Sequence, residues 1–321
     1  MASEIKINII ELVRANLGKL IRADKKNIFY LLYYSILESI LLLVSPLASA
    51  VIINSVLAHA SLSVYVLSFM VITIFLGIAT LQVLKQYIIE KFEQKIFVQN
   101  AIEVAEASEG VKDLDMTIDK YMNYFFDIIS IQKLFPSLML NGSSLLVKLI
   151  ISLMLLFVFD INLFVLGIFF IIIFMILIFF LGKKGVVYSI ERSNAKHEAI
   201  YFLQHIPYLK ENENVFKKLD MYLVAFVKAR QKMFMVIIRQ LSLTFFMEGI
   251  ILSSFFILGG YLVFEGKMPI GEFVASEIII ISVTYALRDF MKQIDYLYDM
   301  IEGFYKIDKL SKRLKKDNVS L

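Results

Sequence analysis

The stretch KYMNYFFDIISIQKLF, residues 120–135, lies directly before one of the most apolar parts of the chain. Its aromatic and aliphatic residues recur at helical spacing, but lysine, asparagine, aspartate and glutamine side chains interrupt them. A helix inside a bilayer rarely carries so many polar groups. We therefore expect this stretch to be a helix that lies in water and continues without a break into a membrane span.

The composition places the whole chain in the membrane class. The 321 residues are 59% hydrophobic and 19% charged, whereas soluble domains are about 45–50% apolar. The chain has no cysteine, which excludes disulfides and thiolate metal sites. Its three histidines, His59, His197 and His205, are too far apart in the sequence to suggest a metal centre, so no metal site is predicted.

Six segments are long and apolar enough to cross a bilayer, which requires roughly 20 residues. They form three pairs with short connections within each pair, and the segments between pairs, 90–133 and 183–240, still have helical periodicity. The sequence thus predicts an all-α polytopic membrane protein with six transmembrane helices and two long helical hairpins. The predicted spans are 28–57, 64–89, 134–159, 161–182, 241–264 and 270–294.

Basic residues are distributed very unequally between the two sides of these spans. Of the 33 lysines and arginines, 30 lie in the N-terminal segment, the two long segments or the region from Arg288 onward, and one, Lys267, lies in a short connection. Cytoplasmic loops carry the excess of Lys and Arg. We therefore expect an integral protein of the cytoplasmic (inner) membrane, with both termini and both hairpins in the cytoplasm. A buried soluble helical protein would not show this asymmetry.

The sequence divides into three regions around these spans. Residues 1–27 are predicted to form an amphipathic helix along the cytoplasmic leaflet, with an ordinary packed helix as the alternative. Residues 28–314 form the transmembrane domain. The basic tail 315–321 either binds anionic lipid headgroups or serves as a linker.

The two long segments are predicted to turn back at defined tips. The first is interrupted near Ser108–Gly110, where glycine and capping residues weaken a helix. The second turns around Pro207. With some 15–20 residues on each side of the tip, each hairpin would extend about 25 Å beyond the bilayer.

This arrangement resembles the transmembrane domain of an ABC exporter, over roughly residues 10–314. Four stretches are similar to the branch that includes bacteriocin and type I secretion exporters, and the spacing of spans and hairpins is more specific than any single motif. The resemblance implies a dimer with a second copy or a homologous transmembrane subunit, surrounded by lipid. It also implies a nucleotide-binding ATPase that carries ATP and Mg. The four stretches are IRADKKNIFYLLYYSI (21–36), residues 120–160, YLVAFVKARQKMFMVIIRQ (222–240) and residues 270–310.

The chain shows no ATP-binding motif of its own. The stretch closest to a Walker A loop, GYLVFEGKM at 260–268, has five residues between its glycines instead of four and ends in Met. We therefore expect a transport component without enzymatic activity, and no nucleic-acid partner. The ATPase would be a separate subunit or part of a longer chain. A transporter of similar fold driven by an ion gradient, or a scaffold that does not transport, remains an alternative. Peptides, lipids and amphiphilic drugs all fit as substrates.

The hairpin tips are the predicted docking sites for the ATPase. A docking surface needs a few apolar anchors with a polar rim, for which Val111, Leu114, Tyr208 and Phe216 are the candidates. The alternative is that both tips are solvated turns. The full set of docking candidates is Val111, Lys112, Asp113, Leu114, Pro207, Tyr208, Glu211 and Phe216.

Ionisable residues within the predicted spans are the candidate pathway residues, because such groups usually face a bundle interior or a wet cavity. Lys148, Glu248 and Glu277 are predicted to line a cavity between two copies of the chain, or to form structural salt bridges. A proton-coupled carrier would use Glu248 or Glu277 as its titrating group. Lys85 lies near the inner boundary, where snorkelling is expected to place its ammonium in water.

Overall fold

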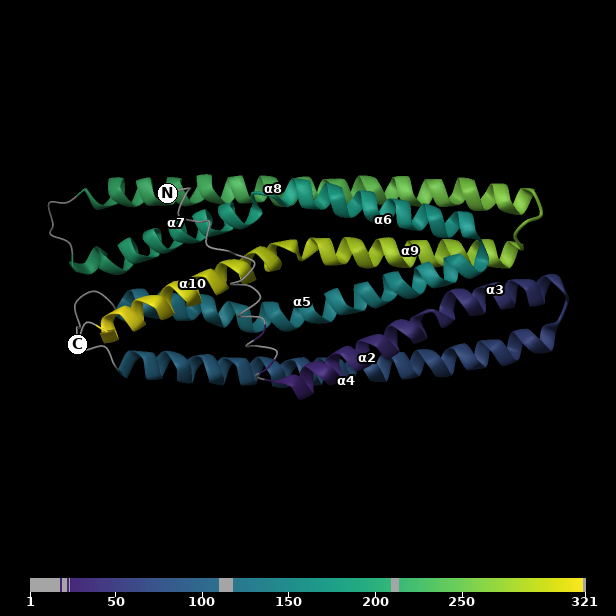
Figure 1. The fold of residues 1–321 in the computed structure, drawn as a ribbon, viewed down its shortest axis with the longest axis horizontal. Helices are drawn as coiled ribbons and strands as arrows, with labels where there is room; N and C mark the ends of the chain where they lie inside the picture. The colour runs from purple at the N-terminus through teal and green to yellow at the C-terminus, as the bar shows by residue number, and fades with distance from the viewer. Residues whose placement is uncertain (1–17, 19–21, 23, 110–117, 209–213, 320–321) are drawn as a thin grey trace.

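The computed structural model describes residues 18, 22, 24–109, 118–208 and 214–319, and they form long helices running side by side along one axis (Figure 1). The predicted segment 1–27 lies largely outside these residues. The helices are α2 (Lys25–Leu42), α3 (Val44–Leu57), α4 (Ser61–Glu109), α5 (Ile118–Phe159), α6 (Ile161–Gly182), α7 (Gly185–His205), the 3-10 turn η1 (Ile206–Tyr208), α8 (Val215–Phe264), α9 (Ile270–Lys292) and α10 (Ile294–Val319).

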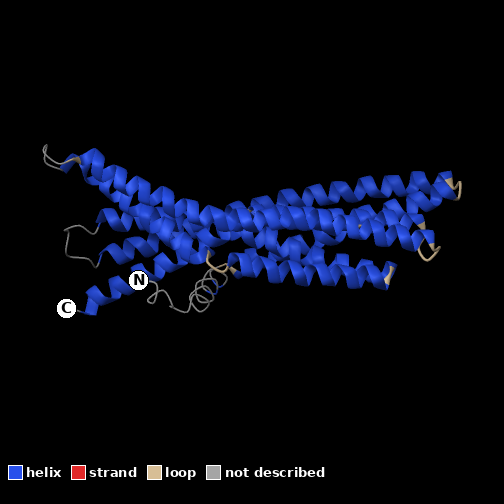
Figure 2. Ribbon diagram, turned by 90° about the horizontal axis from the view of Figure 1, so that it is seen from above, coloured by secondary structure: helices blue, strands red, loops and turns tan. Residues whose placement is uncertain are grey.

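Within the part of the chain that the structure describes, six helical segments are long and apolar enough to span a membrane, which confirms the predicted all-α membrane fold. One end of the bundle holds the short connections 58–60, 160 and 265–269, and we name it the short-loop end. The opposite end, named the hairpin end, holds the end of α4, the start of α5 and the turn between α7 and α8 (Figures 1 and 2). Helix α5 runs through residues 120–135 into the third span without a break, as predicted.

The first span is divided at Leu43, where α2 ends and α3 begins. Pro46 explains the break, because proline lacks the amide hydrogen and its ring clashes with the carbonyl four residues earlier. The Leu43 amide instead donates to the Ile40 carbonyl at 3.2 Å, a tighter turn than an α-helix.

A second break separates α6 from α7, and it follows from the packing of α10. A Cβ atom at Gly185 would lie 2.2 Å from the ring of Tyr298, and one at Gly182 would lie 2.5 Å from the Gln240 amide. The two glycines therefore leave room for Tyr298, whose hydroxyl is 3.1 Å from Gln240 Oε1. Tyr298 of α10 thus contacts both Gly182 at the end of α6 and Gln240 of α8.

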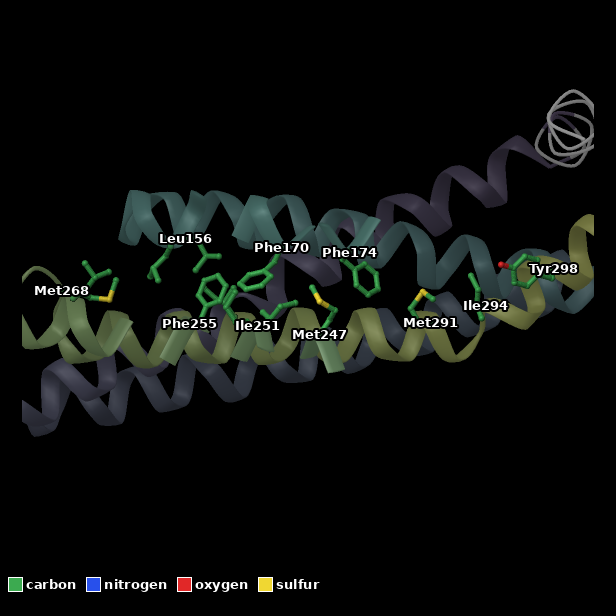
Figure 3. Close-up of a cluster of buried hydrophobic side chains, with 14 of the residues drawn as sticks. Leu156, Phe170, Phe174, Met247, Ile251, Phe255, Met268, Met291, Ile294 and Tyr298 are labelled. Carbon is green, nitrogen blue, oxygen red and sulfur yellow. The ribbon is translucent and has the colours of Figure 1, made fainter. Parts of the chain in front are cut away.

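The main apolar core runs along α5, α6, α8, α9 and the start of α10 (Figure 3). Phe255 of α8 and Leu156 of α5 are each 1% exposed, and Phe170 and Phe174 of α6 point toward α8 (Figure 3). A smaller core joins α2, α4, α5 and α10 around Phe92 and Phe304. Helix α9 contacts α8 of the main core, and it also contacts α3, which packs against α4. It therefore lies between α8 and α3.

Candidate functional site

Glu248 is held in an ion pair that crosses from α8 to α9. Arg288 Nη1 donates to Glu248 Oε1 at 3.0 Å, and the guanidinium carbon lies 4.3 Å from the centre of the Tyr285 ring. The side chain of Glu248 is 14% exposed. Because the pair is mostly withdrawn from water, each charge depends on the other for compensation. Within one chain, Glu248 thus joins two spans.

Lys148 of α5 is half-buried and has carboxylates on two neighbouring helices. The charges that act on its ammonium are those of Glu38 on α2 and Asp289 on α9. Both of these helices contact α5. Among the described residues, Lys148 forms no ion pair of its own. The Lys148 ammonium is therefore influenced by two acidic side chains, but it forms an ion pair with neither of them.

The expectation that Lys85 would snorkel to water is wrong. Its ammonium forms an ion pair with Glu38, and both side chains are only 7% exposed. Gln82 Nε2 donates to the second carboxylate oxygen of Glu38 at 2.8 Å. Since α2 and α4 pack against each other here, the partner on the adjacent helix offsets the burial of both charges.

Glu277 of α9 differs from these residues because its carboxylate has no partner. The residue is 5% exposed, and neither Oε1 nor Oε2 has a hydrogen-bond partner among the described residues. Seven residues from the start of α9, it lies about 10 Å from the short-loop end at 1.5 Å per residue.

Two glycines hold the helices around Glu277 close together. A Cβ atom at Gly259 of α8 would lie 2.7 Å from the Phe273 ring and 4.0 Å from Glu277 Oε1. A Cβ atom at Gly271 of α9 would lie 2.6 Å from the carbonyl oxygen of Ala50 on α3. Glycine is required at such close approaches of helix backbones. Gly259 thus lets α8 pack closely on the part of α9 that carries Phe273 and Glu277, and Gly271 lets α9 pack closely on α3.

Lys148, Glu248 and Glu277 do not form a single cluster within one chain. Each lies in a different environment, and their role in a substrate cavity stays a prediction. The sequence analysis missed Arg288, which it grouped with the basic C-terminal region. Its position inside the predicted span 270–294 was the available signal, because an arginine within a span normally needs a partner.

The second hairpin tip exposes the apolar side chains predicted to be anchors. Tyr208 and Phe216 are each 84% exposed, and Pro207 in the 3-10 turn is also exposed. They lie where α7 ends and α8 begins (Figure 1). Val111, Lys112, Asp113, Leu114 and Glu211 lie outside the described residues, so their docking role stays a prediction.

A network of charges that the sequence analysis did not anticipate joins α7 to α10. Arg192 of α7 forms ion pairs with Asp299 and with Glu302, the latter at 3.3 Å. Ser189 Oγ donates to Glu302 Oε2 at 3.0 Å, and Lys306 Nζ is 2.9 Å from Glu302 Oε1. Burial raises the pKa of the Asp299 carboxyl, and the adjacent Arg192 guanidinium opposes that effect. The network fixes the second hairpin against the helix that follows the last span.

An apolar cavity of about 60 Å³ lies between α5, α6, α8 and α9. Phe170 and Phe174 of α6 line one wall, and Ile251 and Phe255 of α8 line another. Liquid water occupies about 30 Å³ per molecule, whereas typical pockets for drug-sized ligands measure 300–1,000 Å³. This cavity is therefore a packing defect of the core rather than a passage through one chain.

Comparison with known proteins identifies the fold. No protein-family model matches the sequence, and no curated protein matches it. Among solved structures, a bacterial Atm1-family ABC exporter with ATP bound superimposes with a TM-score of 0.74 over 91% of this chain, at 11% sequence identity. The chain spans about half, 54%, of the length of that exporter chain. The similarity to bacteriocin and type I secretion exporters stays a prediction from the sequence. The described helices have the fold of the transmembrane domain of an ABC exporter.

Proposed function

We propose that the chain is the membrane-spanning half of an ABC-type exporter. Two such chains, or one chain and a homologous subunit, form the substrate pathway in the cytoplasmic membrane, and a nucleotide-binding ATPase supplies the energy. The Lys and Arg distribution supports placing both termini and both hairpins in the cytoplasm. The fold shared with an ABC exporter supports the transport role.

The observation that carries the proposal is the length of the membrane helices. Helix α8 has 50 residues, which corresponds to about 75 Å at 1.5 Å per residue, whereas the hydrocarbon core of a bilayer is about 30 Å thick. Because α8 is continuous from Phe216 at the tip to the short-loop end, a force applied at the tip moves the membrane part. The ion pairs of Arg192 hold α7 against α10. They therefore make the second hairpin, formed by α7 and the first part of α8, more rigid.

The small apolar cavity inside one bundle supports a pathway shared by two chains. The apolar cavity among α5, α6, α8 and α9 is far smaller than the volume of an ordinary ligand site. A pathway of useful size would require walls from two copies. Lys148, half-buried and without an ion pair, is our candidate for a residue that faces such a pathway.

Site-specific photocrosslinking in native membranes tests the docking of an ATPase. A benzophenone amino acid at Phe216 replaces one exposed aromatic ring with another, and Lys228 on the same helix is an exposed control position. We expect an adduct at position 216 with a polypeptide that contains a Walker A motif, much less adduct at 228, and a reduced yield after Tyr208→Ala. An equal yield of adduct at positions 216 and 228 would contradict the proposal. The absence of any adduct with an ATP-binding protein would contradict it as well.

Transport assays separate this function from the alternatives. In native membrane vesicles, flux that stops on ATP depletion but survives a protonophore supports the ATP-driven exporter. The opposite pattern supports a carrier driven by an ion gradient. The absence of any flux that depends on the chain supports a scaffold.

A further inference from the structure

Among the described residues, Glu277 is a buried ionisable residue of a membrane span whose two carboxylate oxygens have no hydrogen-bond partner. Glu38 has Lys85 and Gln82, and Glu248 has Arg288. Glu277 has no hydrogen-bond partner among the described residues, although it is as buried as Glu38, each being 5% exposed. An ionised carboxylate left in this position would be strongly destabilised, whereas its protonated form would not carry that penalty.

The helices around Glu277 provide no cation to pair with it. Helix α3, which packs closely on α9, contains no titratable residue between Val44 and Leu57. In the membrane part of α8 the titratable residues are Glu248, held by Arg288, and Tyr261, whose hydroxyl donates to Glu265. Helix α5 carries Lys148, whose charge is influenced by Glu38 and Asp289 and not by Glu277.

On α9 itself, Glu272 lies in the first turn, and Tyr285, Arg288, Asp289 and Lys292 lie toward the other end. None of these groups is a hydrogen-bond partner of the Glu277 carboxylate. Both oxygens of the carboxyl group are thus buried within the packed chain and have no hydrogen-bond partner among the described residues.

We propose that Glu277 is a proton-binding site whose occupancy is linked to the packing of α3, α8 and α9 at the short-loop end. With the proton bound, the three helices pack as in the structure. When the carboxyl group loses its proton, the resulting carboxylate needs water or a cation beside it. Water or a cation can reach this position only when the helices separate. The packed state therefore binds the proton more tightly than the separated state, so acid favours packing and alkali favours separation.

This inference is independent of an ATPase, and it makes the chain sensitive to pH even without nucleotide. One proton linked to the transition changes the ratio of separated to packed molecules by up to about tenfold per pH unit. In a transporter of this fold, such a site would allow the pH at the short-loop side to influence release of the substrate.

Infrared difference spectroscopy tests whether the site binds a proton. The full-length chain in lipid nanodiscs should show the C=O stretch of a protonated carboxyl group at neutral pH. The band should disappear in Glu277→Gln and persist in Glu272→Gln, a change one and a half turns away on the same helix. Absence of the band in the unmodified chain, or its survival in Glu277→Gln, would overturn the proposal.

Spin-label distances test the link to packing. The chain has no cysteine, so Ser61→Cys and Lys267→Cys, both at exposed positions of the short-loop end, can be labelled cleanly. The distance between them should shift to longer values as pH rises, and in Glu277→Gln it should stay short at every pH. A pH response that Glu277→Gln retains, or no response in the unmodified chain, contradicts the link.

Stability provides a check on the substitution itself. Glutamine is a neutral side chain of nearly the same shape, so Glu277→Gln should fold at least as well as the unmodified chain. A variant much less stable than the unmodified chain would contradict a neutral carboxyl group at this position and would overturn the proposal. None of the three measurements uses nucleotide, so their failure would leave the exporter proposal intact.

Discussion

The carboxylate of Glu38 on α2 and the ammonium of Lys85 on α4 form a buried ion pair between residues 47 positions apart in the chain. Removing one partner of a buried pair leaves the other charge uncompensated, which is far more damaging than losing both. This relationship, repeated by Glu248 and Arg288, explains how the bundle tolerates charged residues within its spans.

Lys85→Met should therefore destabilise the protein by about 3–5 kcal/mol, because it removes the cation paired with the buried Glu38 carboxylate and leaves the hydrogen bond from Gln82. The double variant Glu38→Gln/Lys85→Met should recover most of the loss. The thermal midpoint of helical circular dichroism in lipid nanodiscs measures both effects. Lys232→Met, which breaks an exposed pair with Glu191, is the control and should leave the midpoint unchanged. Equal effects of Lys85→Met and Lys232→Met would refute the compensation argument.

The Glu248–Arg288 pair should show energetic coupling between α8 and α9. In a double-mutant cycle of Glu248→Gln and Arg288→Met, residues in direct contact are expected to couple by about 0.5–3 kcal/mol. The same thermal unfolding assay supplies the four stabilities. Additive effects of the two substitutions would show that the pair does not join the helices.

Gly271→Ala should separate α3 from α9. The new methyl group would approach the Ala50 carbonyl oxygen to 2.6 Å, and backbone gives way less easily than a flexible side chain. We expect a loss of about 1–3 kcal/mol, typical of overpacking. Gly260→Ala is the matched control, because a Cβ atom there meets no atom within 4 Å. If both variants are equally stable, the close packing of these helices is not important for stability.

Arg192→Gln should loosen the second hairpin from α10. The change leaves Asp299 and Glu302 without their main cation on α7, and like charges then repel within a partly buried interface. Hydrogen–deuterium exchange across 185–205 should become faster, with α9 unaffected. Lys232→Gln, at an exposed position of α8, is the control substitution. Unchanged exchange in Arg192→Gln would mean that apolar contacts alone hold α7 to α10.

The sequence predicts the helices of this protein well because their signals are local. Apolar segments of sufficient length mark the spans, and the break at Leu43 follows from Pro46 three positions later. The polar stretch at 120–135 correctly indicates that α5 extends past the membrane. Helix α4 ends at Glu109, within the interruption predicted near Ser108–Gly110, and Pro207 lies in the 3-10 turn that follows α7.

The partners of the buried charges are not predictable in the same way, because they depend on which helices meet and in what rotation. Nothing local in the sequence connects Glu38 to Lys85, or Arg192 to Glu302 over 110 positions. Periodicity identifies a buried face of a helix but not the neighbour that covers it. For the same reason, the sequence marks Glu277 as unusual without showing that it lacks a partner.

Movement of the hairpin tips on ATP binding tests the proposed function most directly. A spin label at Lys217→Cys, exposed beside the tip, reports the distance between two copies of the chain in native membranes. We predict a defined distance between copies that shortens when a non-hydrolysable ATP analogue is added. If no distance between two labelled copies is detected, the chains are not paired. That result, or a distance that the ATP analogue leaves unchanged, would contradict a paired, ATP-driven exporter.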